Sequence, residues 1–284
     1  MTQRPSPVHV REPWPHSPRA SRLRGDSHCP YLASRLVICA VVATSFGSLA
    51  VSPSTWAVYL VDVLLRSYVI FVGTVMAHEG THGHLGRSRT ANEWWGRLAL
   101  LPCSVPYTNF RKTHHLHHLH TNLPDEDPDL FLKSRFWPEI PLRAVALPHY
   151  WFLWLWRRGR IDRRHVGELL LNYVGIVSVY LCIAWLIGLP RLLSGMAPCF
   201  VLVSILLWYP FAIKTHEGFS TGPEALRSHD YYGHFMFWFS FGLSMHRVHH
   251  ANPWIPWTEL RHFVQEDPRP SRWRLLPRRD IQVV

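Results

Sequence analysis

The sequence has little cysteine, and the cysteines that it has form no recognisable framework. The chain holds five, with no Cys-x-x-Cys spacing, and three of them lie inside apolar runs: Cys29, Cys39, Cys103, Cys182 and Cys199. This pattern argues against a disulfide scaffold and against a cysteine-ligated zinc module. We therefore expect all five thiols to be reduced.

Acidic residues are also scarce, with 19 Asp and Glu against 30 Lys and Arg, which gives a formal net charge of +11. No short apolar core follows Met1, so we expect no secretory signal peptide. Residues 1–31 are instead polar and rich in Pro and Arg, which predicts a disordered basic arm. Residues 263–284 form a basic tail. Since no basic soluble fold is evident, we expect no nucleic-acid partner and attribute the charge to membrane topology and anionic lipid.

Long apolar runs are present, although the mean hydropathy of −0.03 conceals them. A spanning helix needs about 20 mostly apolar residues, and four runs qualify: Leu32–Val51, Trp56–Ala77, Leu169–Ile187 and Met196–Ile213. The connections Ser52–Thr55 and Gly188–Gly195 are short, which predicts two helical hairpins. Asp62 and Arg66 stand four residues apart in the second run and can pair within the membrane.

Two further apolar stretches, Trp94–Tyr107 and Leu142–Trp156, are short or interrupted by proline. We expect them to be re-entrant or interfacial, with Trp151, Trp154 and Trp156 near the lipid headgroups. Nearly all Lys and Arg lie outside the short connections between the runs. By the positive-inside rule, both termini and the large central segment face the cytoplasm.

The histidines are the strongest signal, at 20 in 284 residues. Three clusters stand out: His78-Glu79-Gly80-Thr81-His82, His114-His115-Leu116-His117-His118 and His246-Arg247-Val248-His249-His250. On a helix, residues three and four apart share a face, so eight of these imidazoles converge while His115 points elsewhere. Neutral imidazoles need partners for their nitrogen lone pairs, and a metal supplies them. Eight exceed one tetrahedral zinc, so two metals are implied.

A ninth ligand is expected after the fourth apolar run. His216-Glu217-Gly218 follows that run much as His78-Glu79-Gly80 follows the second, which makes His216 the candidate and His229 its rival. Four further histidines are expected either behind the ligands or at the surface: His115, His120, His234 and His262. The scattered ones are expected to be ordinary surface or capping residues: His9, His16, His28, His84, His149 and His165.

Several carboxylates lie close to the clusters in sequence. Such groups can accept a hydrogen bond from the far nitrogen of a metal-bound imidazole, and the candidates are Glu79, Glu217, Asp125, Asp127 and Asp129. Asn122 belongs to the same stretch as the three aspartates. Asp127-Pro128-Asp129 is equally typical of a turn or a helix cap.

The clusters resemble the histidine boxes of the membrane fatty acid desaturase superfamily, which includes acyl desaturases, hydroxylases, and carotenoid hydroxylases and ketolases. The likeness includes His-His-Leu-His-Thr-Asn-Leu-Pro-Asp-Glu-Asp-Pro-Asp at 117–129 and Pro-Trp-Ile-Pro-Trp at 253–257. It departs at Glu79, where many relatives have Asp, and at Ser244, where many have Asn. These departures bear on the subfamily rather than on metal binding.

The resemblance implies an all-α integral membrane fold over residues 32–262, with four transmembrane helices in two hairpins and a cytosolic helical cap. It also implies a di-iron centre with these ligands: His78, His82, His114, His117, His118, His246, His249 and His250. Related enzymes often add a histidine after the fourth span, which fits His216. No fused cytochrome b5-like domain is recognised, so electrons are expected from a separate protein.

The implied activity is an O2-dependent oxidoreductase that desaturates or hydroxylates a fatty-acyl chain, with two Fe ions as cofactor. A carotenoid hydroxylase or ketolase acting on an isoprenoid remains the alternative. The electron donor would be ferredoxin, or cytochrome b5 with its NAD(P)H reductase.

Other classes explain less of the sequence. His78-Glu79-x-x-His82 matches the motif of zinc proteases, but an intramembrane protease leaves the other two clusters without a purpose. A metal transporter would place its ligands near the bilayer midplane, whereas these clusters lie at the ends of the apolar runs.

Overall fold

The computed structural model describes residues 31–218, 228–231 and 233–260. All elements within these ranges are helical, in agreement with the all-α prediction. The predicted basic arm, apart from Tyr31, and the predicted basic tail lie outside the described residues.

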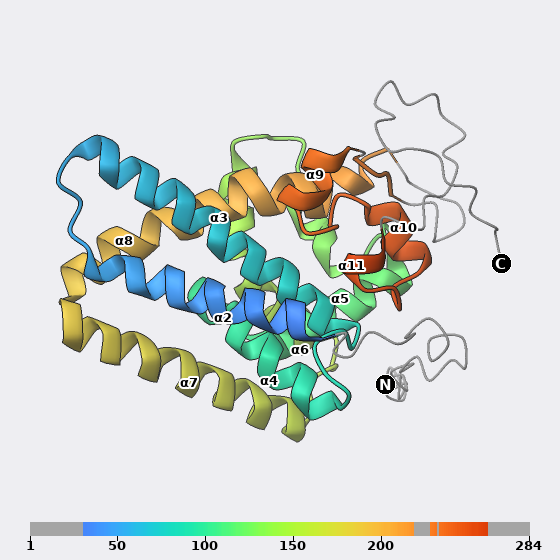
Figure 1. Ribbon diagram of the computed structural model, residues 1–284. Coiled ribbons are helices and arrows are strands. Elements are labelled where there is room, and N and C mark those ends of the chain that lie inside the picture. The colour runs from blue at the N-terminus through green and yellow to red at the C-terminus, as the bar shows by residue number, and fades with distance from the viewer. Residues whose placement is uncertain (1–30, 219–227, 232, 261–284) are drawn as a thin grey trace.

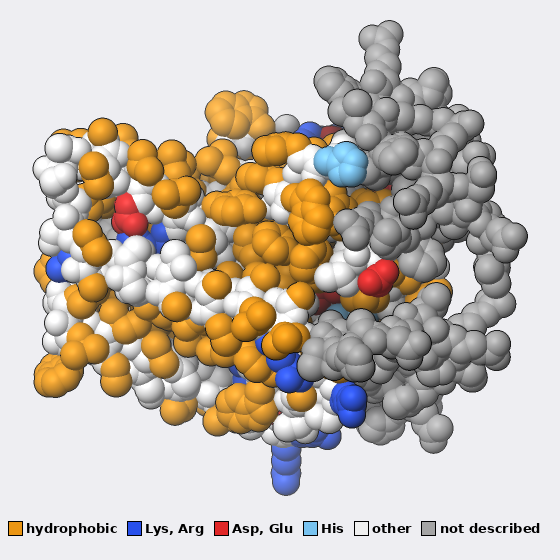
Figure 2. All heavy atoms as spheres, in the orientation of Figure 1, with side chains coloured by type: hydrophobic (Ala, Val, Ile, Leu, Met, Phe, Trp, Pro, Cys, Tyr) orange, Lys and Arg blue, Asp and Glu red, His pale blue; other side chains and the backbone are white. Residues whose placement is uncertain are grey.

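Four long apolar elements run side by side: α2 (Leu32–Gly47) with η1 (Ser48–Ala50), α3 (Trp56–Thr81), α7 (Arg163–Ile187) and α8 (Leu189–Leu202). The last continues through a π-helix, η4 (Val203–Ile213), into η5 (Lys214–His216). Each of the four is long and apolar enough to cross a membrane. Both turns between paired helices lie at the left end of Figure 1, so the pairs form two hairpins. Side chains on the same end of the molecule are mostly hydrophobic (Figure 2).

The second hairpin differs from the prediction at its boundaries. α7 begins at Arg163 rather than at Leu169, because Asp162 caps it by accepting a hydrogen bond from the backbone N–H of His165 at 2.7 Å. α8 begins at Leu189, so the expected connection Gly188–Gly195 shrinks to Gly188, whose φ is +87°. Pro190 does not prevent this early start, because the first helical turn needs no N–H donor there.

The two proline-interrupted stretches are helical. α4 (Arg89–Leu100) is followed by η2 (Leu101–Cys103), and α6 (Glu139–Arg157) runs continuously through Pro148. α4 packs closely on α3 at Gly73, where an added Cβ would lie 2.6 Å from the carbonyl oxygen of Ala99. A side chain at Gly73 would therefore push the two helices apart.

The expected pairing of Asp62 with Arg66 is present inside α3. Arg66 is 2% exposed, and its remaining donors reach the hydroxyl of Ser48 at 3.0 Å and the carbonyl of Gly195 at 2.8 Å. One buried guanidinium thus ties α3 to the turn of its own hairpin and to α8 of the other.

Shorter helices gather at the end of the molecule opposite the hairpin turns: α5 (Tyr107–His120), α9 (His234–Phe239), α10 (His246–Ala251) and α11 (Trp257–Leu260). A short turn of helix, η3 (Pro128–Leu132), follows α5. This arrangement brings the C-terminal end of α3 close to α5 and α10, which carry the other two histidine clusters.

Candidate metal centre

The nine histidines predicted as ligands fall into two adjacent groups. Within each group, one atom per residue lies within 4.8 Å of the corresponding atoms of all the others. The first histidine group contains five side chains: His78, His82, His114, His118 and His249. The second histidine group contains four: His117, His216, His246 and His250.

α5 contributes to both groups because of its helical periodicity. His114 and His118 are one turn apart and face the first group, while His117 faces the second. His118 also stacks on His250 of the second group, with ring centroids 4.1 Å apart. His115 turns away, as predicted, and its Nε2 lies 2.8 Å from the carbonyl oxygen of Thr81.

His216 rather than His229 is the histidine that joins the second group. Its Nε2 lies 3.1 Å from Nε2 of His117 and 2.8 Å from Nε2 of His246. His229 donates its backbone N–H to Thr215, and its ring packs against Tyr231. Of the two candidates for a ninth ligand, the geometry therefore favours His216.

The spacing of the ring nitrogens suits metal coordination. Nε2 atoms in the first group approach to 2.9 Å between His82 and His114 and to 3.2 Å between His118 and His249. At a metal–nitrogen distance of about 2.1 Å, two imidazole ligands at right angles lie about 3.0 Å apart. These ring nitrogens are therefore spaced as ligands of one metal ion would be.

The groups are largely enclosed, with only His82, His118 and His250 half-buried, and most of their imidazoles are held neutral. Burial, together with repulsion from neighbouring imidazoles, holds the pKa well below the ordinary histidine value at six members: His82, His114, His118, His246, His249 and His250. Nε2 of His78 is buried and has no hydrogen-bond partner within the described part of the chain. A buried polar nitrogen without a partner costs free energy, and a bound metal ion would remove that cost. The residues present thus fit a pair of metal ions.

Two carboxylates stand behind His117. Its Nδ1 lies 3.0 Å from Oδ1 of Asp127 and 3.8 Å from Oδ2 of Asp129. Burial alone would lower the pKa of His117, but the charge of Asp127 raises it to about 9. Burial raises the pKa of Asp129 to about 6. A carboxylate on the far nitrogen fixes the tautomer and orientation of a ligating imidazole.

Trp151 completes this arrangement from α6. It was expected near the lipid headgroups, but only 4% of it is exposed, and its indole N–H donates to Oδ1 of Asp129 at 2.8 Å. Trp154 is likewise buried, whereas Trp156 is exposed. Trp151 and Trp154 therefore pack inside the protein, and only Trp156 presents its ring to the surroundings.

Glu79 links the first cluster to the end of the described chain. Its Oε2 lies 2.8 Å from Nδ1 of His84 and accepts the backbone N–H of Trp257 at 3.0 Å. Its Oε1 lies 3.8 Å from Nδ1 of His78. His84 was given no role from sequence, yet it is 7% exposed and lies beside the metal-ligand candidates. No spacing signal marks it, because it follows the end of α3.

The other predicted partners of the histidines behave differently. Glu217 is exposed and pairs with Lys214 at 2.7 Å, so its expected contact with an imidazole is replaced by a surface ion pair. Asp125 has an exposed side chain at a turn of positive φ, and its carbonyl accepts from Arg158. Asn122 donates its side-chain N–H to the carbonyl of His216 at 3.0 Å.

Asp230 is a site residue that the sequence did not indicate. Its Oδ1 accepts the backbone N–H of Arg247 at 2.7 Å and thereby caps the N-terminus of α10, which carries the third cluster. The residue is distant from this helix in sequence, so no local capping pattern reveals it.

The fold and site define a helical protein with four helices able to cross a membrane and nine histidines placed where they could bind metal, and the comparisons give its family. Residues 54–277 match the sequence model described as fatty acid desaturase. The chain belongs to this family, within the membrane fatty acid desaturase superfamily that its histidine clusters resemble.

Curated relatives include the sn-1 acyl-lipid omega-3 desaturase (ferredoxin) of Synechocystis sp., which is 31% identical over 117 residues, or 38% of this chain and 33% of the relative. The sn-1 oleoyl-lipid 12-desaturase of Picosynechococcus sp. is 28% identical over 123 residues, 41% of this chain and 35% of that protein. The omega-3 fatty acid desaturase fat-1 of Caenorhabditis elegans is 30% identical over 84 residues, which are 29% of this chain and 21% of that protein. Each match covers about a third or less of the relative's length.

Proposed function

We propose that the chain is a membrane-bound, O2-dependent di-iron oxidoreductase that desaturates an acyl chain of a lipid. The observation that carries this proposal is the pair of adjacent buried histidine groups. Within each group, the ring nitrogens are close enough together to be ligands of one metal ion. In this proposal the first histidine group holds one iron ion and the second holds the other.

The bound and reduced iron pair would activate O2, which is the oxidant, for attack on an unactivated C–H bond. In desaturation, two hydrogen atoms leave adjacent methylene carbons and a double bond forms. These hydrogens, with two electrons from a donor and two protons, reduce O2 to two molecules of water. The protein would orient the metal ligands, as Asp127 orients the ring of His117. Burial of the site would exclude bulk water.

The relatives support an acyl substrate over a carotenoid. Their names specify acyl lipids, oleoyl lipids or fatty acids, and all are called desaturases. We therefore favour desaturation over hydroxylation, and an acyl chain over an isoprenoid substrate for a hydroxylase or ketolase.

The electron donor is proposed to be a separate protein. Ferredoxin is the first choice, because it is named for the Synechocystis relative; cytochrome b5 with its NAD(P)H reductase is the other. We further propose that residues 32–262 form the membrane domain between the basic arm 1–31 and the tail 263–284. Both termini and the metal centre would face the cytoplasm, where the basic residues concentrate.

A zinc protease built on the His78-Glu79-x-x-His82 motif finds less support. Such an enzyme needs its glutamate to activate a water molecule. Here one carboxylate oxygen of Glu79 is engaged by His84 and the backbone of Trp257.

Expression in a host supplied with both fatty acids and carotenoids, followed by lipid mass spectrometry, tests the proposal. The expected product is an acyl lipid lighter by two hydrogens. Addition of one oxygen to a carotenoid, with acyl chains unchanged, would replace this function by carotenoid hydroxylation.

A further inference from the structure

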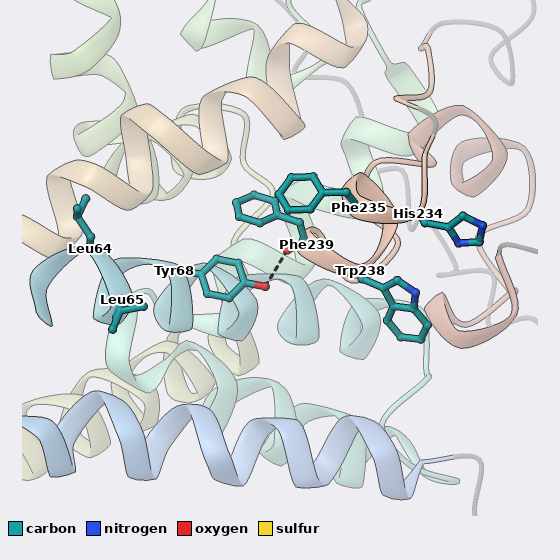
Figure 3. Close-up of a pocket in the computed structure, with 7 residues that line it drawn as sticks. All are labelled: Leu64, Leu65, Tyr68, His234, Phe235, Trp238 and Phe239. Carbon is teal, nitrogen blue, oxygen red and sulfur yellow. Dashed lines mark hydrogen bonds between the residues drawn. The ribbon is translucent and has the colours of Figure 1, made fainter. Parts of the chain in front are cut away.

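A groove opens on the outer surface between α3 and α9. Its volume is about 720 Å³, and it is shallow, being open to the surroundings over most of its extent. The lining comes from two short stretches, as Figure 3 shows: Leu64, Leu65 and Tyr68 of α3, and His234, Phe235, Trp238 and Phe239 of α9. No Asp, Glu, Lys or Arg is among these seven residues.

The surroundings of the groove identify what would fill it. Leu64 and Leu65 are 55% and 61% exposed on α3, and Phe235 and Trp238 are 74% and 50% exposed on α9. α3 is one of the four helices able to cross a membrane. Apolar surface on such a helix faces hydrocarbon rather than water, so the medium that fills the groove is the acyl chains of lipids.

The groove also has a polarity that matches a lipid. In Figure 3, Leu64 and Leu65 lie at one end, and the polar atoms of His234 and Trp238 lie at the other. Tryptophan favours the level of the headgroups, because its ring is apolar and its N–H is polar. A lipid would therefore lie with its tail against the leucines and its headgroup towards His234.

An aromatic floor separates the groove from the core beneath the histidines. The hydroxyl of Tyr68 donates to the carbonyl of Phe239 at 3.1 Å, and their rings stack with centroids 5.0 Å apart. Phe239 in turn contacts Phe71 and Phe211. These two buried rings lie two helical turns before His78 on α3 and shortly before His216, respectively. The floor of the groove is thus in contact with the elements that carry residues of both histidine groups.

We propose that this groove binds one acyl chain of a membrane glycerolipid and is the lateral entrance by which that lipid reaches the metal centre. Its role as an entrance rests on the proposed desaturase function. Lipid binding itself rests on the groove alone, so an experiment can refute the entrance and leave the lipid site standing, or the reverse.

Photolabelling of the full chain in vesicles tests the binding. The probe is a phosphatidylcholine with a diazirine in the middle of one acyl chain, in phosphatidylcholine vesicles, and labelled peptides are identified by mass spectrometry. Labelling is expected to concentrate on residues 64–68 and 235–239, relative to exposed positions of α7. Leu65→Trp fills the groove and should lower this labelling roughly tenfold.

Leu181→Trp is the matched control, because Leu181 is 64% exposed on α7 and lies outside the groove. It should leave the groove labelling unchanged. Leu64→Phe provides a second filling variant, and the metal content of each purified variant checks that it has folded. Labelling that spreads evenly over α3 and α7, or that survives both filling variants in folded protein, overturns the proposal.

Kinetics on the same variants test the entrance. Leu65→Trp should raise KM for the lipid substrate roughly tenfold and leave kcat and iron content unchanged. Concentrated labelling without any desaturation would uphold the lipid site and refute the proposed enzyme. Desaturation with an unchanged KM in Leu65→Trp would uphold the enzyme and refute the entrance.

Discussion

Nδ1 of His117 lies 3.0 Å from Oδ1 and 3.1 Å from Oδ2 of Asp127, while Nε2 of the same ring points into the second histidine group. Asp127 also accepts the backbone N–H groups of Asn122 and Asp129, at 2.8 and 2.9 Å. The carboxylate is therefore fixed by its own turn before it orients the imidazole. Such a contact sets which nitrogen of the ring is free to bind a metal.

Asp127→Asn should weaken the second half of the metal centre. The amide keeps the shape of the carboxylate but loses the charge that makes the imidazole a better ligand, and such changes typically cost about 10–100-fold in metal affinity or activity. Iron content and the rate of lipid desaturation are the measurements. Asp125→Asn is the control, because that side chain is exposed; equal losses in both variants would contradict the role given to Asp127.

The spacing of the clusters predicted much of this site. Helical periodicity alone places His114, His117 and His118 together and turns His115 away, and the structure agrees. The division of these residues between two groups could not be predicted, since it depends on where α3, α10 and η5 approach α5. The same limit applies to Glu217, because the sequence does not show that it pairs with the neighbouring Lys214 rather than with a distant imidazole.

His118→Ala and His115→Ala separate a proposed ligand from its sequence neighbour. His118 belongs to the first histidine group and stacks on His250 of the second, so its loss should abolish the lipid product and reduce bound iron. His115 contacts the carbonyl of Thr81, so His115→Ala should retain most of the activity. Full activity with normal iron in His118→Ala would show that the ligand assignment is wrong.

His84→Ala should destabilise the folded state without removing a metal-ligand candidate. The change removes the imidazole that lies 2.8 Å from the buried carboxylate of Glu79, and a buried polar group that loses a partner costs about 1–3 kcal/mol. A lower midpoint of thermal unfolding is the expected result. His149→Ala, at an exposed position of α6, should leave the midpoint unchanged, and a matching midpoint for the two variants would argue against this role for His84.

Arg66→Met should destabilise the packing between the two hairpins. It removes the ties from α3 to Ser48 and Gly195 and leaves Asp62 unpaired. Breaking a buried ion pair from one side costs about 3–5 kcal/mol, and the lower end applies because Asp62 is 27% exposed. Adding Asp62→Leu should recover part of the loss in a denaturation assay, and a double variant less stable than the single one would contradict this explanation.

The membrane helices were predicted better at their centres than at their ends. Apolar runs reveal a span, but a boundary depends on local contacts such as the Asp162 cap that begins α7 at Arg163. Asp230, which caps α10 from a distant part of the chain, illustrates the same point for the metal centre. Contacts of this kind need the tertiary structure.

Quantification of iron in the purified full chain tests the central claim most directly. The wild-type protein should bind two iron ions per chain. His82→Ala and His216→Ala alter different histidine groups, so each should bring the content close to one, whereas His149→Ala should leave it at two. One zinc ion per chain, or an iron content that no substitution in either group alters, would contradict the assignment of a di-iron centre to these histidines.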